Sequence, residues 1–315
     1  MILSAGEALF DMIRQPGSAL IEPIIGGSPL NVALGLARLG RPTAYLSKLS
    51  TDYFGQQLWD FLVREQIATT FVPRASGMQS TLGFAFIQPG GHADYAFYVA
   101  NAADRSLEVS DLPAAWPDEL TSAHFGSYSL AIEPTATTLI NLFHEFAATR
   151  FLSYDPNIRA SLIGDRALWL DRFSGLLPKA DFIKASIEDA HWIYGAHVTA
   201  DDIARQWSTM GPRVAVITDG GVGATIAVEG ETRFITAHKV AVVDTVGAGD
   251  TFQAAYLARL DELGLASKAR RNEITLAVAE EIGRFAVAAA AMTCTRRGAD
   301  LPRRAEVDAF LKTST

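Results

Sequence analysis

Hydrophobic positions along this chain form two kinds of run that alternate over most of its length. Short, nearly continuous apolar runs predict buried strands, and longer runs with apolar residues three or four apart predict helices. The predicted strands span residues 1–6, 44–49, 123–128, 150–155, 181–186 and 214–220. The predicted helices span residues 29–40, 56–66, 136–149 and 201–211. This alternation is typical of parallel βαβ units, so we expect an α/β fold that binds ligands at the carboxyl ends of its strands.

Two segments do not follow this alternation. Residues 80–99 contain two strand-like runs around a Pro-Gly-Gly sequence, which predicts a hairpin. Residues 11–27 are strand-like as well, with Pro16 and Gly17 interrupting them. The two segments either form a small antiparallel sheet that projects from the main body or serve as edge strands of the main sheet. The pattern alone leaves both arrangements open.

The composition narrows the classes of protein. With 315 residues, 49% of them hydrophobic, the chain can bury the core of one large α/β domain. Its most apolar stretch, residues 285–294, is about half as long as a bilayer crossing requires, and the N-terminus lacks the basic region of a signal peptide. The single cysteine, Cys294, excludes an internal disulfide and favours the reducing cytoplasm. A net charge of -8 argues against a nucleic-acid partner, and we expect no membrane partner.

The glycine-rich run DTVGAGDTF, residues 244–252, is the main candidate for chemistry. Gly247 and Gly249 let an anion approach the backbone closely. Asp250 lies near the start of a predicted helix, whose free N–H groups and dipole attract negative charge. In phosphoryl transfer an aspartate accepts the proton of the attacking hydroxyl, a role that Asp250 can fill. The alternative is that Asp250 or Thr251 only caps the helix.

Other nucleotide-binding schemes lack their motifs in this sequence. No GxxxxGK[ST] string is present, and neither HRD nor DFG occurs. No GxGxxG follows the first predicted strand, which disfavours a nicotinamide-dependent oxidoreductase.

Residues 244–257 resemble the C-terminal signature of the PfkB, or ribokinase-like, family of carbohydrate kinases, and GGSPLNVALGLARLG at 26–40 resembles its N-terminal signature. The resemblance covers essentially the whole chain. It implies a single kinase domain over 1–315, a three-layer α/β/α sandwich with a mostly parallel sheet, and a small β-sheet lid from about 11–27 and 80–99. It also implies Asp250 as the catalytic base and the run Gly247, Ala248 and Gly249 as an anion hole.

The resemblance further implies a sugar site. Asp11, Gly27 and Asn31 match sugar contacts, although Asp11 could be a surface carboxylate at a strand end and Asn31 only a helix cap. Arg159, at the end of the string DPNIR, matches an arginine that meets the transferred phosphate. Phe97 would either cover the apolar face of the sugar or pack within the lid.

For the nucleotide and its ions the resemblance implies binding of ATP and Mg²⁺, with K⁺ as a candidate. The segment KASIED supplies Lys184 and Ser186 at the nucleotide, and Glu188 or Asp189 would hold Mg²⁺ through water, unless the segment is only a solvated helix start. The other implied nucleotide residues are Thr218, Gly220, Gly223, Gly247 and Gly249. Backbone oxygens implied at K⁺ are those of Asp244, Val246, Thr293, Arg296 and Gly298.

Within the family the sequence looks closest to fructokinases, so we expect ATP-dependent phosphorylation of a sugar hydroxymethyl group, with fructose as the substrate. The alternatives are 2-keto-3-deoxygluconate, or ribose and nucleosides. A different class, a regulator that keeps the fold without chemistry, would be expected to have a damaged base or anion hole, and both are intact here. Exposed lid strands would favour a homodimer through the lid.

Overall fold

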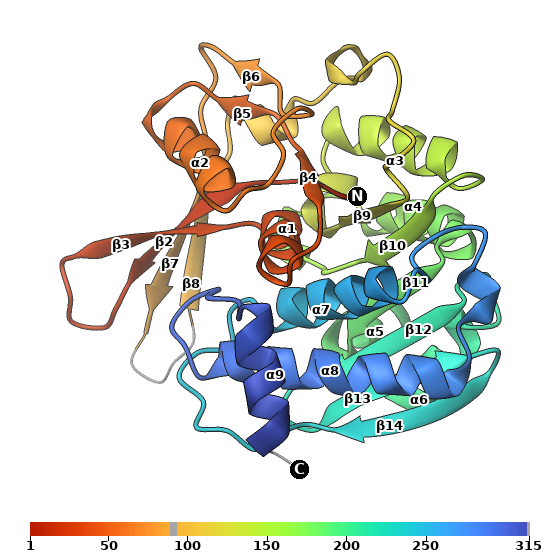
Figure 1. Ribbon diagram of the computed structural model, residues 1–315. Coiled ribbons are helices and arrows are strands. Elements are labelled where there is room, and N and C mark those ends of the chain that lie inside the picture. Colours follow the sequence, from red (N-terminus) through yellow and green to blue (C-terminus); the bar gives the residue numbers. More distant parts are fainter. Residues whose placement is uncertain (89–92, 314–315) are drawn as a thin grey trace.

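The chain folds around a central sheet with helices on both faces (Figure 1). The computed structural model describes residues 1–88 and 93–313. In sheet order, the strands within these residues are β14 (Glu231–Thr236), β13 (Gly223–Val228), β12 (Val214–Asp219), β11 (Phe182–Ser186), β10 (Phe151–Asp155), β9 (Ser122–Gly126), β1 (Ile2–Ala5) and β4 (Thr43–Leu46). Neighbours from β4 to β12 are parallel, and β13 and β14 add an antiparallel edge.

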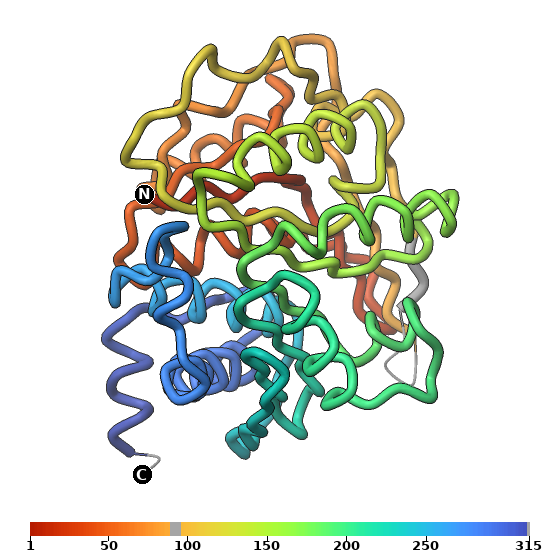
Figure 2. Tube along the Cα trace, turned by 90° about the vertical axis from the view of Figure 1, so that its right-hand side faces the viewer, coloured from red at the N-terminus to blue at the C-terminus, as the bar shows by residue number. Residues whose placement is uncertain are grey.

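Helices form a layer on each face of this sheet. One layer holds α1 (Ser28–Arg38), α7 (Ala248–Glu262) and α8 (Leu276–Cys294), with α9 (Arg304–Thr313) packed on α8. The other holds α3 (Thr135–Phe146), α4 (Arg166–Leu176), α5 (Ile187–Tyr194) and α6 (Ala200–Trp207). Figure 2 shows the blue C-terminal helices and the green helices on opposite sides. The three-layer fold class is therefore confirmed.

A separate sheet projects from the main body (Figure 1). Its order is β3 (Ile21–Gly26), β2 (Leu9–Arg14), β7 (Thr81–Ile87) and β8 (Ala93–Tyr98). The outer pairs are antiparallel, but β2 and β7 are parallel, so the expected all-antiparallel sheet is wrong at its centre. The reason is that β2 and β7 both run outward from the main body and each returns through its own hairpin. The predicted Pro-Gly-Gly turn at 89–91 lies outside the described residues.

The remaining elements lie at the margins of this framework. A two-stranded sheet of β5 (Leu49–Ser50) and β6 (Arg74–Ala75) and the helix α2 (Tyr53–Arg64) pack beside β4. The predicted strands and helices are present with ends shifted by a few residues, although the predicted strand at 44–49 is interrupted after Leu46. Across residues 1–88 and 93–313, none of the helices combines the length and the apolar content that a membrane crossing requires.

Candidate active site

A cavity of about 1130 Å³ lies between the carboxyl ends of the central strands and the projecting sheet. The projecting sheet contributes Asp11 and Phe97 to its wall, the starts of α1 and α7 contribute Asn31 and Asp250, and the turn after β12 contributes Gly220. Parallel sheets bind ligands at this edge. The cavity therefore joins the expected sugar residues and the expected nucleotide residues in one space.

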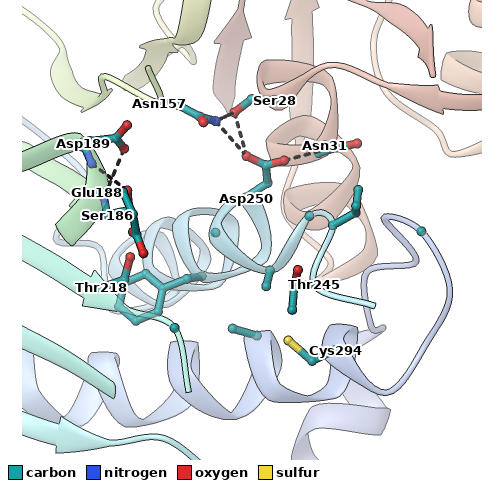
Figure 3. A pocket seen from close by; sticks show the side chains of 18 of the residues that line it. Ser28, Asn31, Asn157, Ser186, Glu188, Asp189, Thr218, Thr245, Asp250 and Cys294 are labelled. Carbon is teal, nitrogen blue, oxygen red and sulfur yellow. Dashed lines mark hydrogen bonds between the residues drawn. The ribbon is translucent and has the colours of Figure 1, made fainter. Parts of the chain in front are cut away.

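Asp250 lies in the first turn of α7 and faces α1 (Figure 3). Its side chain is 8% exposed. Asp250 Oδ1 accepts a hydrogen bond from Ser28 Oγ at 2.6 Å, and Oδ2 accepts one from Asn31 Nδ2 at 2.8 Å. The helix begins at Ala248, with Gly247 as its N-cap in the left-handed region (φ 78°). The alternative that Asp250 or Thr251 caps this helix is therefore wrong, and the Asp250 carboxylate is directed into the cavity wall instead.

A third segment reaches the same carboxylate from β10. Asn157 Nδ2 donates to Ser28 Oγ at 2.6 Å and lies 3.4 Å from Asp250 Oδ1. The strand β10 ends at Asp155, whose Oδ1 accepts the Asn157 backbone N–H at 3.2 Å and fixes the turn. Segments more than 90 residues apart in the sequence thus converge on one carboxylate. Sequence reasoning quoted both Ser28 and Asn157 within motifs but gave neither a role.

The start of α1 settles the position of Asn31. Gly27 is the N-cap of α1, so Asn31 lies inside the helix and does not cap it. Gly27 has a φ of 109°, and a Cβ atom there would lie 2.6 Å from the Glu7 carbonyl oxygen. Both facts require glycine at this position. The backbone can then pass close to Glu7 and deliver Ser28 and Asn31 to Asp250.

Lys184 lies buried beneath the start of α7. Its ammonium forms an ion pair with Asp155 Oδ2 at 2.7 Å and donates to the Gly249 carbonyl at 3.4 Å. Burial raises the pKa of Asp155 to about 6, although the Lys184 charge opposes this shift. Burial alone would lower the pKa of Lys184, but the Asp155 carboxylate outweighs burial and the pKa is raised. The ammonium therefore has protein partners and stays charged at neutral pH.

The projecting sheet is the expected lid, and its expected sugar residues lie in one cross-strand row. Asp11 on β2 is the register partner of Gly83 on β7, and Gly83 is the partner of Phe97 on β8. A Cβ atom at Gly83 would lie 3.0 Å from the Phe97 ring, and one at Gly26 would lie 2.4 Å from Asp11 Oδ2. The two glycines thus leave room for the ring and the carboxylate, which both line the cavity.

Two carboxyl groups in this half of the cavity have raised pKa values. Burial raises the pKa of Asp11 to about 6, while the nearby Arg159 guanidinium opposes the shift. Glu7, directly after β1, is 1% exposed and accepts a hydrogen bond from Ser129 Oγ. Burial raises the pKa of Glu7 to about 7. Sequence reasoning missed Glu7, although a carboxylate directly after the first strand was a usable signal for a residue at this edge.

Arg159 lies on the exposed loop after Asn157 and lines the cavity. Its Nη1 donates to Asn157 Oδ1 at 2.5 Å, so Asn157 links the guanidinium to Asp250. Of the expected anion-hole residues, Ala248 donates its N–H to the Thr245 carbonyl at 3.2 Å. Gly247 and Gly249 line the cavity beside it.

The other half of the cavity is bounded by the hairpin of β12 and β13 and by α8. Thr218, Gly220 and Gly223 all line it. Gly223 has a φ of 147°, and a Cβ atom there would lie 2.1 Å from the Ile235 carbonyl oxygen, so this turn requires glycine. Apolar side chains complete the wall: Val242, Val287, Ala290, Ala291 and Cys294.

The candidate magnesium carboxylates differ in their surroundings. Asp189 forms a capping box with Ser186 at the start of α5, and its Oδ1 also accepts the Ile158 N–H at 2.9 Å. Glu188 is exposed at the cavity edge. The described part of the chain contains no group of three or more His, Cys, Asp or Glu side chains placed to hold a metal ion. Asp189 is thus largely committed to the backbone, and Glu188 is the carboxylate with free capacity.

The segments expected at a monovalent cation are tied together by Asp244. Its Oδ1 accepts the Val246 N–H at 3.1 Å, and its Oδ2 accepts the Gly298 N–H at 2.9 Å. Thr293 is buried nearby at the end of α8, where its hydroxyl lies 2.8 Å from the Thr251 hydroxyl. Arg296 follows α8 and forms an ion pair with Glu306 at 2.5 Å. These contacts hold residues 244–246 and 293–298 together beside the start of α7.

Comparison with known proteins adds a family to this geometry. The family model described as pfkB family carbohydrate kinase matches residues 6–305. A fructokinase from Rhizobium leguminosarum bv. trifolii is 36% identical over 274 residues, 85% of this chain and 82% of that protein. A fructokinase from Klebsiella pneumoniae is 31% identical over 300 residues, 95% and 97% of the two chains. The crystal structure of a fructokinase from Xylella fastidiosa with bound ATP is 26% identical, with a TM-score of 0.91 over 99% of this chain and 98% of that one.

Proposed function

The chain belongs to the pfkB family of carbohydrate kinases, and from this premise we propose that it transfers the terminal phosphoryl group of ATP to a hydroxymethyl group of fructose. The observation that carries the proposal is the Asp250 carboxylate, which Ser28 and Asn31 hold at the wall of the cavity. On one side of Asp250 lie the lid residues, and on the other side lie the turn after β12 and the apolar wall of α8. A sugar and a nucleotide can therefore meet at this carboxylate.

In the proposed reaction Asp250 orients the sugar hydroxyl and accepts its proton as the new bond to phosphorus forms. The leaving group is the nucleoside diphosphate. The amino end of α7 carries backbone N–H groups and a positive dipole end that stabilise the charge on the transferred group. Arg159 would meet the same phosphate from the opposite loop, and Asn157 orients its guanidinium.

The ions of the proposed site have different ligands in the chain. Mg²⁺, when bound with ATP, neutralises phosphate charge, and Glu188 would hold its water shell. Carbonyl oxygens of the segments that Asp244 joins are hard ligands suited to K⁺. Lys184, Thr218, Gly220 and Gly223 would contact the nucleotide, with the Lys184 contact limited by its ion pair to Asp155.

The charges around the lid favour a neutral sugar. The carboxylates of Asp11 and Asp250 line this half of the cavity, with Arg159 beside them. An acidic sugar would be repelled by the Asp11 and Asp250 carboxylates. Fructose offers hydroxyl groups that can donate to Asp11 instead.

A substrate panel tests this choice. ADP release would be followed with fructose, 2-keto-3-deoxygluconate, ribose and a nucleoside, each with and without K⁺. We expect the highest kcat/KM with fructose and a higher rate with K⁺. Turnover of 2-keto-3-deoxygluconate without turnover of fructose would refute the fructose assignment. If the protein binds ATP but turns over none of these substrates, the alternative of a regulator that keeps the fold without chemistry would be favoured.

We also infer a cytoplasmic homodimer in which the outer faces of two lid sheets meet. Phe84 and Phe86 stack on that face at 6.0 Å, and Tyr98 beside them is 64% exposed. Burial of these partly exposed aromatic side chains against a second lid sheet would remove apolar surface from water. Sedimentation of the wild type and of Tyr98→Glu would test this: a dimer that the charge dissociates is expected, and a wild-type monomer would exclude it.

A further inference from the structure

A row of polar side chains crosses the central sheet underneath α1 and α7. Ser4 on β1, His124 on β9 and Ser153 on β10 are register partners, and all three are fully buried. One pleat earlier on the same face the register partners are Ile2, Ser122 and Phe151, so that row has one polar side chain where this row has three. Burying polar groups costs free energy unless they form hydrogen bonds. The change from apolar to polar side chains just below the cavity therefore requires a reason.

The hydrogen bonds of this polar row lead to the first turns of the two helices. Ser4 Oγ donates to the Pro29 carbonyl at 2.7 Å, in the first turn of α1. Gln253 Nε2, one turn after Asp250 in α7, donates to Ser153 Oγ. His124 Nδ1 lies 3.0 Å from Ser153 Oγ and 3.4 Å from Gln253 Nε2. The polar row thus binds the two helix starts that carry Ser28, Asn31 and Asp250.

Apolar packing alone would leave these helices free to shift by small amounts. Where they meet, Gly35 of α1 approaches α7 so closely that a Cβ atom on it would lie 2.5 Å from the Ala254 Cβ. A contact between such small groups restricts sliding and rotation little, whereas hydrogen bonds are directional. Burial lowers the pKa of His124 to about 3, so its ring is neutral at physiological pH and its contacts do not change in that range.

We propose that Gln253, together with Ser4, His124 and Ser153, positions the base: these four residues fix the starts of α1 and α7 on the sheet and so hold Asp250 in register with Ser28 and Asn31. The inference rests on the proposed function for its kinetic readout. None of the four residues needs to touch the substrate. Their contribution is to keep Asp250 within the small displacement that phosphoryl transfer tolerates.

Gln253→Met is the principal test, because methionine has a similar length and cannot form these hydrogen bonds. We expect kcat with fructose to fall by about tenfold to hundredfold, with little change in the KM for ATP. Tyr256→Phe is the matched control. It removes a buried hydrogen bond from the same helix, the Tyr256 hydroxyl to the Ala279 carbonyl at 3.0 Å, on the side facing α8. This variant should lose thermal stability and keep its kcat.

Ser153→Ala provides a second, milder variant in case Gln253→Met does not fold. The double variant should be no slower than the slower single variant, because both changes remove the same contact. If Gln253→Met and Ser153→Ala both keep the wild-type kcat while losing stability as Tyr256→Phe does, the polar row is structural and the proposal is wrong.

A crystal structure of Gln253→Met separates this outcome from a failure of the proposed function. In that variant we expect the distance from Asp250 Oδ2 to Asn31 Nδ2, 2.8 Å in the wild type, to exceed hydrogen-bond length. If the distance is unchanged, the positioning role is refuted whatever the enzyme phosphorylates. If it lengthens while the wild type itself turns over no sugar, the proposed function fails and the positioning role stands.

Discussion

At the scale of single residues, Asp250 carries the proposed chemistry. Asp250→Asn keeps the size of the side chain but cannot accept a proton, so kcat should fall by about 10² to 10⁴. ATP affinity should stay within a few-fold, because the backbone at the start of α7 is unchanged. Steady-state kinetics and calorimetric titration with ATP would measure both quantities. Wild-type turnover in this variant would show that another group is the base.

Asp11 gives a prediction about pH. Burial raises its pKa to about 6, so the carboxylate that would accept sugar hydroxyls is half protonated near that pH. In the wild type, kcat/KM for fructose should rise as pH increases through about 6. Asp11→Asn should raise the KM for fructose by about tenfold at pH 7.5 and remove this rise, while the KM for ATP serves as the internal control. An unchanged pH profile would exclude Asp11 as the titrating group.

Glu7 gives a prediction about stability. The folded protein keeps the Glu7 proton up to about pH 7, whereas the unfolded chain releases it near the ordinary pKa of 4.5. Its contribution to stability is therefore complete below about pH 4.5 and is lost as pH rises through 7. Relative to the wild type, Glu7→Gln should gain stability between pH 5 and 8, approaching about 3 kcal/mol. Urea unfolding at several pH values would show it, with the substitution Glu145→Gln at an exposed position as the control.

Sequence reasoning reached some of these residues and missed others for one physical reason. Asp250 was predicted from the glycine run together with the family resemblance, and Asn31 was predicted from the resemblance. Ser28, Asn157 and Glu7 act through contacts with residues distant in the sequence. No local pattern records such contacts, although the position of Glu7 after the first strand marks it as a residue of the sheet edge. The helix-cap alternatives for Asp250 and Asn31 were wrong for the same reason, since their partners lie on other elements.

At the scale of elements, the start of α7 depends on Gly247. Its φ of 78° and a Cβ position only 2.7 Å from the Ala299 Cβ exclude a side chain without rearrangement. Gly247→Ala should cost about 1–3 kcal/mol of stability and lower kcat, because the first turn that holds Asp250 must shift. Thermal unfolding and fructose kinetics would measure both effects.

Gly175→Ala is the matched control for this change. Gly175 lies exposed in α4, and a Cβ atom there meets nothing within 4 Å. Alanine should be neutral or stabilising at this helical position. If both variants were equally stable and equally active, the backbone conformation at Gly247 would have no special role.

The elements themselves were largely predictable from the chain. Strands buried on both faces, such as β1 and β10, form short and mostly apolar runs, and α1 and α3 show clear helical spacing. The parallel pairing of β2 with β7 was not predictable, because strand direction within the lid depends on where two distant hairpins leave the main body.

At the scale of the whole molecule, the lid and the sheet edge enclose one cavity. Sugar binding should complete its closure and exclude water from the transferred phosphate. Without sugar, ATP hydrolysis should then stay below about 1% of the fructose-dependent rate. Phosphate release measured with ATP alone and with fructose would test this. Comparable rates in the two conditions would show that the site does not depend on the sugar for its assembly.

The two sheets of the molecule contribute different parts of the site. The residues at 9, 11, 13, 24, 85, 87 and 97 line the cavity from the projecting sheet, and none of them contributes a hydrogen bond to Asp250 within the described residues. Substitutions there can change which acceptor fits while the machinery for transferring the phosphoryl group stays intact. Mutation and selection can thus change the acceptor at these positions while the hydrogen bonds to Asp250 stay in place. In a lineage with this architecture, the acceptor substrate can therefore change through single substitutions in the projecting sheet.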